Sequence, residues 1–107
     1  VVPSSAQASI YSVTLHYLRA AQASNTDKGV AVVEKMKSMQ ISEDDPMARN
    51  AYVREDGRMV HDMYLLEVKK PSESKEPMDY FRLIRVIPGD EAFRPLADGE
   101  CPFVAKK

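Results

Sequence analysis

Two long runs of strand-forming residues, 58–69 and 79–87, constrain the fold of this chain more than any other feature. A polar segment, Lys70 to Pro77, separates them, and Pro88-Gly89 follows the second run. This pattern is typical of two strands joined by an exposed loop and ended by a turn. Both alternating faces of the first run are largely apolar, which indicates that other structure covers the strand on both sides over part of its length.

A third, shorter strand is predicted over 51–54, just before the turn Glu55-Asp56-Gly57. Asp-Gly is a hairpin signal, because these residues accept the backbone conformation that tight hairpin turns require. The sequence therefore predicts a three-strand meander, with strands at about 51–54, 58–69 and 79–87. From residue 97 to residue 107 the chain is predicted to be an irregular tail.

Two helices are predicted before the strands, the first over about 5–23. Its apolar residues recur at the spacing of one helix face: Tyr11, Leu15, Leu18 and Ala21. A serine after Pro3 suits the N-cap position. Ser24-Asn25 favours an end to the helix, since both residue types prefer caps and turns.

The second helix is predicted over about 27–39, with Thr26 as its N-cap. Val30, Val33 and Met36 are expected to form its apolar face. Only a few residues separate the two helices, so they should pack as an antiparallel or steeply crossed pair. The polar segment 42–50 that follows is predicted to be a loop.

The order of these elements leaves two fold classes open. Two helices followed by a strand meander make an α+β domain if the chain stands alone. The same order occurs at the end of a larger α/β protein. With 107 residues, of which 44% are hydrophobic, the chain forms one small unit with a thin core.

Charge and hydropathy exclude two classes of partner. The formal net charge is −1 and the two signs are interleaved, so the sequence lacks the basic stripe that a nucleic-acid backbone requires. No apolar run approaches the roughly 20 residues of a membrane span. We therefore expect neither nucleic-acid binding nor membrane insertion.

Residues that commonly carry chemistry do not gather into a site. His16 and His61 are the only histidines and lack the partner spacing of metal ligands or of acid–base pairs. We expect His16 on the helix surface and a structural role for both. The run Glu43-Asp44-Asp45 lacks the alternation of a calcium loop and is predicted to be a solvated loop. No catalytic residues, no metal and no cofactor are predicted.

Cys101 is the only cysteine, so no disulfide forms within one copy of the chain. Two interpretations remain open. The thiol is unpaired, or it pairs with a cysteine in a part of the protein outside this sequence, which an oxidising compartment would permit.

Three stretches resemble one known family. They are the helix YSVTLHYLRAAQASNTD (11–27), the pair VVEKMKSM and ARNAYVREDGRMVHDMYLLEVKKP within 32–71, and PMDYFRLIRVIPGDEAFRPL (77–96). The strings DGRMVHDMYL and IPGDEAFRPL are the most specific. Together the stretches resemble the C-terminal part of the extracellular solute-binding proteins of ABC transporters, in the branched-chain amino acid group of type I periplasmic binding proteins.

The resemblance implies an α/β fold in which this chain is a C-terminal fragment of a two-lobed protein. Its helices would pack on one lobe and its strands would lead back through the hinge region. Ligand that contacts both lobes selects the closed state, which is presented to the membrane permease. The implied protein is periplasmic and not an enzyme. The N-terminal stretch VVPSSAQAS has no signal-peptide pattern, as expected if the chain begins within a longer protein.

The resemblance also implies which residues approach the solute. Ala6 matches a position where some branched-chain amino acid binders place an aromatic against the ligand, and alanine departs from that pattern. A different or larger solute would then fit. Ser5 and Gln7 flank Ala6 and offer polar contacts. A serine at a helix start is, alternatively, a cap.

An alternative interpretation is a self-contained α+β domain for ligand sensing or protein interaction, since such domains reuse the same fold. The two readings differ in one expectation. A fragment leaves apolar surface bare where the missing lobe should pack, whereas a closed domain does not. The fragment would hide such a surface by forming a homodimer or exchanging strands.

Overall fold

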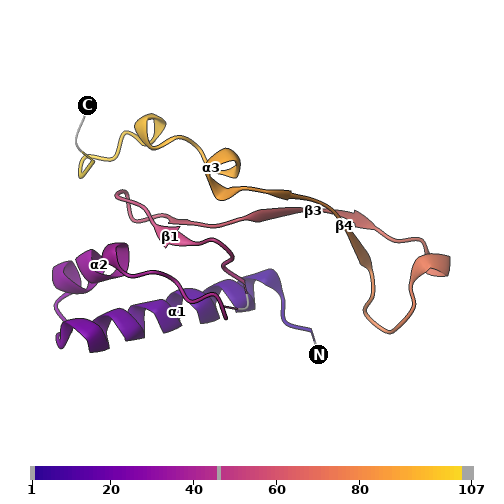
Figure 1. Cartoon of the computed structure of the whole chain (residues 1–107), viewed down its shortest axis with the longest axis horizontal. Coiled ribbons are helices and arrows are strands. Elements are labelled where there is room, and N and C mark those ends of the chain that lie inside the picture. The colour runs from indigo at the N-terminus through magenta and orange to yellow at the C-terminus, as the bar shows by residue number, and fades with distance from the viewer. Residues whose placement is uncertain (1, 46, 105–107) are drawn as a thin grey trace.

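A computed structural model describes residues 2–45 and 47–104. The elements follow in the order α1 (Ser5–Ser24), α2 (Gly29–Ser38), β1 (Tyr52–Val53), β2 (Met59–Val60), β3 (Met63–Val68), η1 (Pro71–Glu73), β4 (Phe81–Ile87), α3 (Gly89–Ala92) and η2 (Leu96–Gly99). The two long helices lie side by side, β1 lies over them, and the pair β3–β4 extends away from this body (Figure 1). Residues 105–107 of the predicted tail lie outside the described residues.

Local capping signals explain where α1 begins and ends. Ser4 is the N-cap: its Oγ accepts a hydrogen bond from the Gln7 backbone at 3.3 Å, and the Gln7 side chain accepts one from the Ser4 backbone at 2.8 Å. This reciprocal pair is a capping box. Asn25 ends the helix with φ 49°, a left-handed conformation that asparagine tolerates. The predicted range 5–23 agrees with these signals.

The start of α2 differs from the prediction. The helix begins at Gly29 with Lys28 as its N-cap, and no side chain caps it. Thr26, the predicted cap, instead accepts a hydrogen bond from the Lys28 backbone at 3.2 Å, which holds the turn just before the helix. Glycine at the first helical position weakens the first turn, so the helix starts two residues later than predicted.

The helix faces that pack are not the ones that periodicity predicted. On α1 the buried residues are Ser12, His16 and Ala20, whereas Tyr11 and Leu18 of the predicted stripe are 58% and 56% exposed. On α2 only Val32 is buried, and Val30 is 82% exposed. The predicted faces are therefore mostly exposed, although Leu15, Ala21 and Met36 are half-buried and Met36 packs against the core. The residues that α1 buries instead are small or polar, and one of them, His16, lies within hydrogen-bond distance of the Met36 carbonyl of α2.

The strands form two separate antiparallel pairs, β1 with β2 and β3 with β4. The predicted order of strands is retained, but the long strand 58–69 is interrupted at His61 and Asp62, so its two halves pair with different partners. The turn between β1 and β2 contains Gly57 with φ 81°, as the Asp-Gly signal predicted. A bulge between Leu65 and Leu66 shifts the register of β3–β4 and bends the pair locally.

The core is small and lies between α2, the loop 39–51 and the hairpin β1–β2. Ile41, Ala48 and Val53 form its centre, and Met36, Ala51 and Met59 pack against it. Val32 and Val60 are the largest side chains that are fully buried. This core holds the helices and the first hairpin together, and β3 and β4 contribute no buried residue to it.

The molecule is elongated. Its principal extents are 52 × 33 × 18 Å and its radius of gyration is 16.9 Å, against about 13 Å for a compact domain of this length. The pair β3–β4, with η1 at its closed end, accounts for the extension (Figure 1). None of the described helices has the length and apolar character that crossing a membrane requires.

Candidate functional site

The exposed beginning of α1 carries the three residues for which the family resemblance implies solute contact. Ser5, Ala6 and Gln7 are all exposed. The Gln7 carbonyl oxygen serves the capping box with Ser4, which leaves its amide group free to donate. Ser4 is the cap, so the Ser5 hydroxyl is not needed for that role. The three residues therefore lie together in the first turn of α1, with their side chains exposed.

One turn further along α1 lies a small apolar hollow of about 210 Å³. We call it the helix hollow. Residues from α1, from the loop after residue 46, and from β2 line it: Ser9, Ile10, Ser12, Val13, Met47, Ala48, Met59 and His61. Ser9 Oγ lies 3.0 Å from the Met47 sulfur across its edge. Ser5, Ala6 and Gln7 do not line this hollow.

A buried carboxylate fixes the wall of the helix hollow. Asp45 is 5% exposed and its Oδ1 accepts hydrogen bonds from Ser12 Oγ at 2.5 Å and from the backbones of Met47 and Ala48 at 3.0 and 2.8 Å. Burial alone would raise the pKa of Asp45, but these hydrogen bonds outweigh it and lower the pKa below its ordinary 3.8. The prediction of a solvated acidic loop is therefore wrong for Asp45, which ties the loop to α1.

His16 is also placed differently from the prediction. It is 3% exposed, and its Nε2 lies 3.0 Å from the backbone oxygen of Met36. A carbonyl only accepts, so Nε2 carries the proton and the ring joins α1 to the end of α2. The expected position on the helix surface is wrong, because the neighbouring helix covers this face. The expected structural role agrees with the contact.

His61 lies between the two sheets. Its Nδ1 is 2.8 Å from the backbone oxygen of Asp62, and its ring meets Phe93 edge-on at 5.3 Å. Within residues 2–45 and 47–104, no group of three or more histidine, cysteine or acidic side chains is arranged to hold a metal ion. Cys101 is a free thiol in the described part of the chain.

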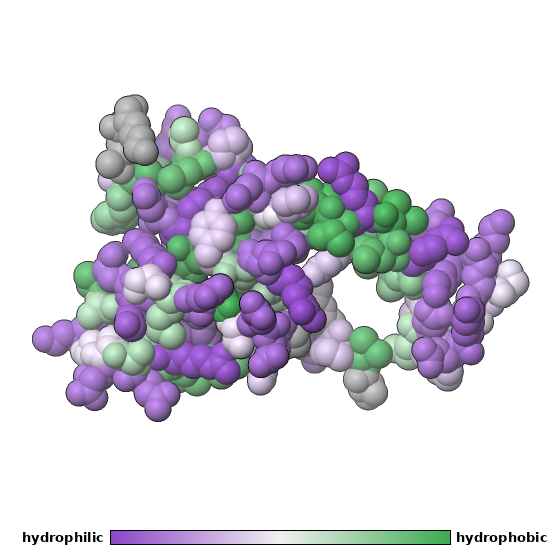
Figure 2. Space-filling model, in the orientation of Figure 1, coloured by the Kyte–Doolittle hydropathy of each residue, from purple (hydrophilic) through white to green (hydrophobic). Residues whose placement is uncertain are grey.

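The pair β3–β4 presents the largest apolar surface. We call residues 63–68 and 81–87 the ribbon. Its large hydrophobic side chains on both faces are 42–71% exposed: Met63, Tyr64, Leu65, Leu66, Val68, Phe81, Leu83, Ile84 and Val86. Figure 2 shows these hydrophobic residues gathered between the body and the polar end of the ribbon. A two-stranded ribbon with two apolar faces is marginally stable in water and is suited to burial between other elements.

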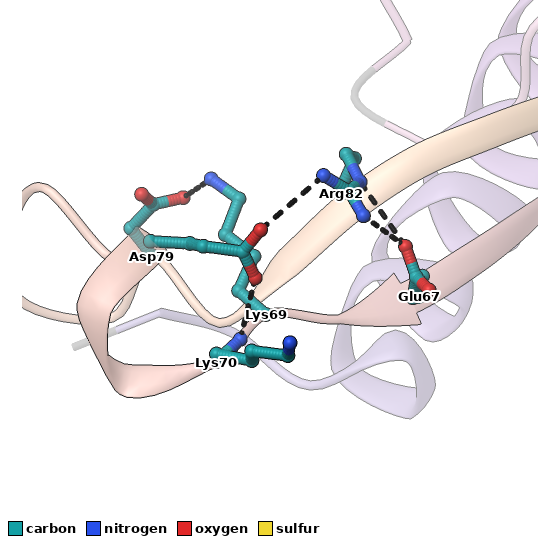
Figure 3. Close-up of polar contacts among 6 residues, drawn as sticks. Glu67, Lys69, Lys70, Asp79 and Arg82 are labelled. Carbon is teal, nitrogen blue, oxygen red and sulfur yellow. Dashed lines mark hydrogen bonds and ion pairs between the residues drawn. The ribbon is translucent and has the colours of Figure 1, made fainter.

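Ion pairs hold the closed end of the ribbon (Figure 3). Lys69 Nζ lies 2.6 Å from Asp79 Oδ1, and Arg82 pairs with both Glu67 and Glu73. The hydrogen bond from Lys69 is the main cause that lowers the pKa of Asp79 below 3.8. This end is therefore polar and carries several internal ion pairs. The apolar middle of the ribbon has no such internal partners.

The long-range contacts of the site carried no signal that sequence reasoning could use. Asp45 lies 33 residues from Ser12, and His16 lies 20 residues from Met36. A polar residue on a helix face is ordinarily taken as exposed. The one usable signal was local: an aspartate just before a turn often accepts hydrogen bonds from the backbone two and three residues on, as Asp45 does.

The comparisons with known proteins agree on one family. A family model described as periplasmic binding protein matches residues 1–75. A solved periplasmic binding protein from Burkholderia mallei is 47% identical, with a TM-score of 0.88. A branched chain amino acid ABC transporter periplasmic ligand-binding protein from Burkholderia xenovorans LB400 is 34% identical, with a TM-score of 0.87.

Both solved structures match 96% of this chain, whereas the chain spans only 27% of the length of each. No curated protein matches it. The similarity therefore extends over nearly the whole chain and over about a quarter of much longer proteins.

Proposed function

This chain belongs to the periplasmic binding protein family, and we propose that it is the C-terminal part of the solute-binding receptor of an ABC transporter. The resemblance that the sequence suggested is confirmed at the level of the family and of a partial fold. We further propose that the receptor is periplasmic, binds a small solute such as an amino acid for uptake, and catalyses no reaction. Its partners would be that solute and the membrane permease.

The observation that carries this proposal is the ribbon. Nine large hydrophobic side chains exposed on both faces of two strands are what a segment cut from a larger fold presents, since a soluble monomer rarely exposes such a surface. The match to about a quarter of longer proteins supports this proposal, because such proteins have further segments that would cover the ribbon. A self-contained sensor or interaction domain, the alternative, would be expected to close its core, and the radius of gyration of 16.9 Å argues against it.

We propose that the beginning of α1 and the helix hollow form one wall of the solute site. The hollow is lined mainly by apolar side chains, and Ser5 and Gln7 offer a hydroxyl and a free amide beside it. Ala6 leaves room where a larger side chain would project toward a solute. Solute held between this wall and the remainder of the receptor would favour the closed state, because it contacts both parts at once.

Thermal unfolding of the longer protein that contains this chain tests the proposal. Amino acids, with branched-chain ones in the panel, should raise the melting temperature in a concentration-dependent way. Ala6→Phe should change the order of preference among solutes, whereas Ala31→Phe, on the exposed surface of α2, should not. If no amino acid shifts the transition, the transport role is wrong. If Ala6→Phe behaves like its control, the assignment of Ser5, Ala6 and Gln7 is wrong.

A further inference from the structure

A second, larger groove lies on the opposite side of the first hairpin from α1. Its volume is about 930 Å³, and no residue of α1 lines it. We call it the arginine groove. It is formed where the segment 92–101 folds back over β1 and β2, and its charged and aromatic lining residues are Arg54, Asp56, Arg58, His61, Phe93 and Arg94.

The charges in this groove do not balance. Asp56 accepts hydrogen bonds from Arg54 Nε at 3.0 Å and from Arg54 Nη2 at 2.7 Å, so these two residues neutralise one another. The hydrogen bond from Arg54 is the main cause that lowers the pKa of Asp56 to about 2, and the carboxylate stays ionised at neutral pH. Asp56 also accepts from the Arg58 backbone at 3.2 Å. These three hydrogen bonds tie the carboxylate to the groove wall.

Two guanidinium groups are left over. Among residues 2–45 and 47–104, neither Arg58 nor Arg94 has a carboxylate within ion-pair distance. Asp56 Oδ2 and Arg94 Nη2 approach Gly99 from two sides, each within 4 Å of the point where a Cβ would stand. A side chain at position 99 would occupy this space.

Contacts also position the Arg58 guanidinium and the backbone of Arg94. The Arg58 guanidinium lies over the Phe93 ring, 5.7 Å from its centre, and His61 packs edge-on against that ring. Arg54 Nη1 donates to the backbone oxygen of Arg94 at 2.9 Å, which fixes the chain that carries the second guanidinium. A guanidinium group binds a carboxylate or a phosphate with less loss of side-chain freedom per hydrogen bond than a lysine does.

We propose that the arginine groove binds a small oxyanion, a carboxylate or a phosphate group, between Arg58 and Arg94. The site lies apart from the beginning of α1, and it goes beyond the proposed transport role. The Arg54–Asp56 pair acts as the rigid floor, and Gly99 leaves the space that the anion occupies.

Titration of the chain with inorganic phosphate and, separately, with succinate tests this inference. The readout is the backbone amide chemical shift of Gly57 and Gly99, both of which line the groove. We expect saturable shifts with at least one anion, and the tighter of the two identifies the head group. Arg58→Gln and Arg94→Gln should each weaken binding about tenfold, since a charge-assisted hydrogen bond is lost. Raising the sodium chloride concentration should weaken it further.

Arg49→Gln is the matched control, because Arg49 is exposed and lies outside the groove. It should leave the affinity unchanged. Equal weakening by the control and the groove variants would mean diffuse attraction and would overturn the site. So would shifts that do not saturate, or binding that is lost in the longer protein. Arg58→Gln and Arg94→Gln should not alter the thermal response to amino acids, so failure here is distinguishable from failure of the proposed transport role.

Discussion

Of the four glycines, Gly89 has the least room for a side chain, and its replacement tests the packing around it. The residue is buried at the start of α3. A Cβ built there would lie 2.7 Å from Val60 Cγ1, 2.8 Å from the backbone oxygen of His61 and 3.0 Å from its carbonyl carbon. Separations below about 3 Å are far inside van der Waals contact, so Gly89→Ala forces some group to move.

The size of the effect follows from which atoms must move. Val60 is 1% exposed and cannot swing into solvent, and the two His61 atoms belong to the backbone at the interruption between β2 and β3. Extra methyl groups in a packed interior typically cost about 1–3 kcal/mol. Because two of the three contacts are with backbone, we expect Gly89→Ala to lower the free energy of unfolding by about 3 kcal/mol, a large part of the stability of a small domain.

Urea unfolding followed by circular dichroism measures this change. Gly29→Ala is the matched control, because nothing lies within 4 Å of a Cβ at Gly29 and the residue begins α2. It should be stabilising by about 0.5–1 kcal/mol, as alanine is the better helix former. A double variant with Val60→Ala should recover only part of the loss, since the His61 contacts remain. If Gly89→Ala is as stable as the original chain, the close approach of α3 to β2 is wrong.

Three further outcomes are expected. Asp56→Asn should remove part of the acid sensitivity of the chain. The pKa of Asp56 is lowered to about 2, so its contribution to the free energy of unfolding is complete above about pH 4 and is lost as the pH falls toward 2. A variant with the same slope of stability against pH would contradict this. His16→Ala should cost about 1–3 kcal/mol in urea unfolding, because the buried Met36 carbonyl loses its donor; no measurable cost would mean that the bond is not formed. We also propose that the isolated chain pairs with a second copy through the ribbon. Leu83→Lys, at an exposed position of β4, should then lower the mass measured by light scattering. A monomeric mass for both the original chain and the variant would exclude such pairing.

Sequence reasoning succeeded where the signal was local. The serine cap of α1, its end at Asn25 and the Asp-Gly turn each depend on residues within a few positions of one another, and all three are seen in the structure. It failed where the contact was distant. Nothing in the sequence near Asp45 or His16 indicates that Ser12 or Met36 will meet it, so both were assigned to the surface.

The candidate site was predicted by other means. The prediction of Ser5, Ala6 and Gln7 rests on resemblance to a family and not on any pattern in this chain, and the structure places them on the exposed first turn of α1. The arginine groove was missed entirely. Arg58 and Arg94 are 36 positions apart in the sequence, and only the return of segment 92–101 over the first hairpin brings them to one surface.

The wrong prediction of the helix faces and the exposure of the ribbon have one physical cause. Periodicity correctly identified an apolar stripe on α1, but Tyr11 and Leu18 remain exposed while a polar face packs on α2. The ribbon repeats this pattern. Its sequence predicted that other structure covers both faces, and the described residues of this chain leave both faces exposed. The apolar stripe of α1 and the ribbon therefore have the amino-acid composition of a protein interior, yet both are exposed. This chain spans 27% of the length of its solved relatives. We propose that further segments of a longer protein cover both surfaces, so that the residues which misled the prediction of the core mark where those segments pack.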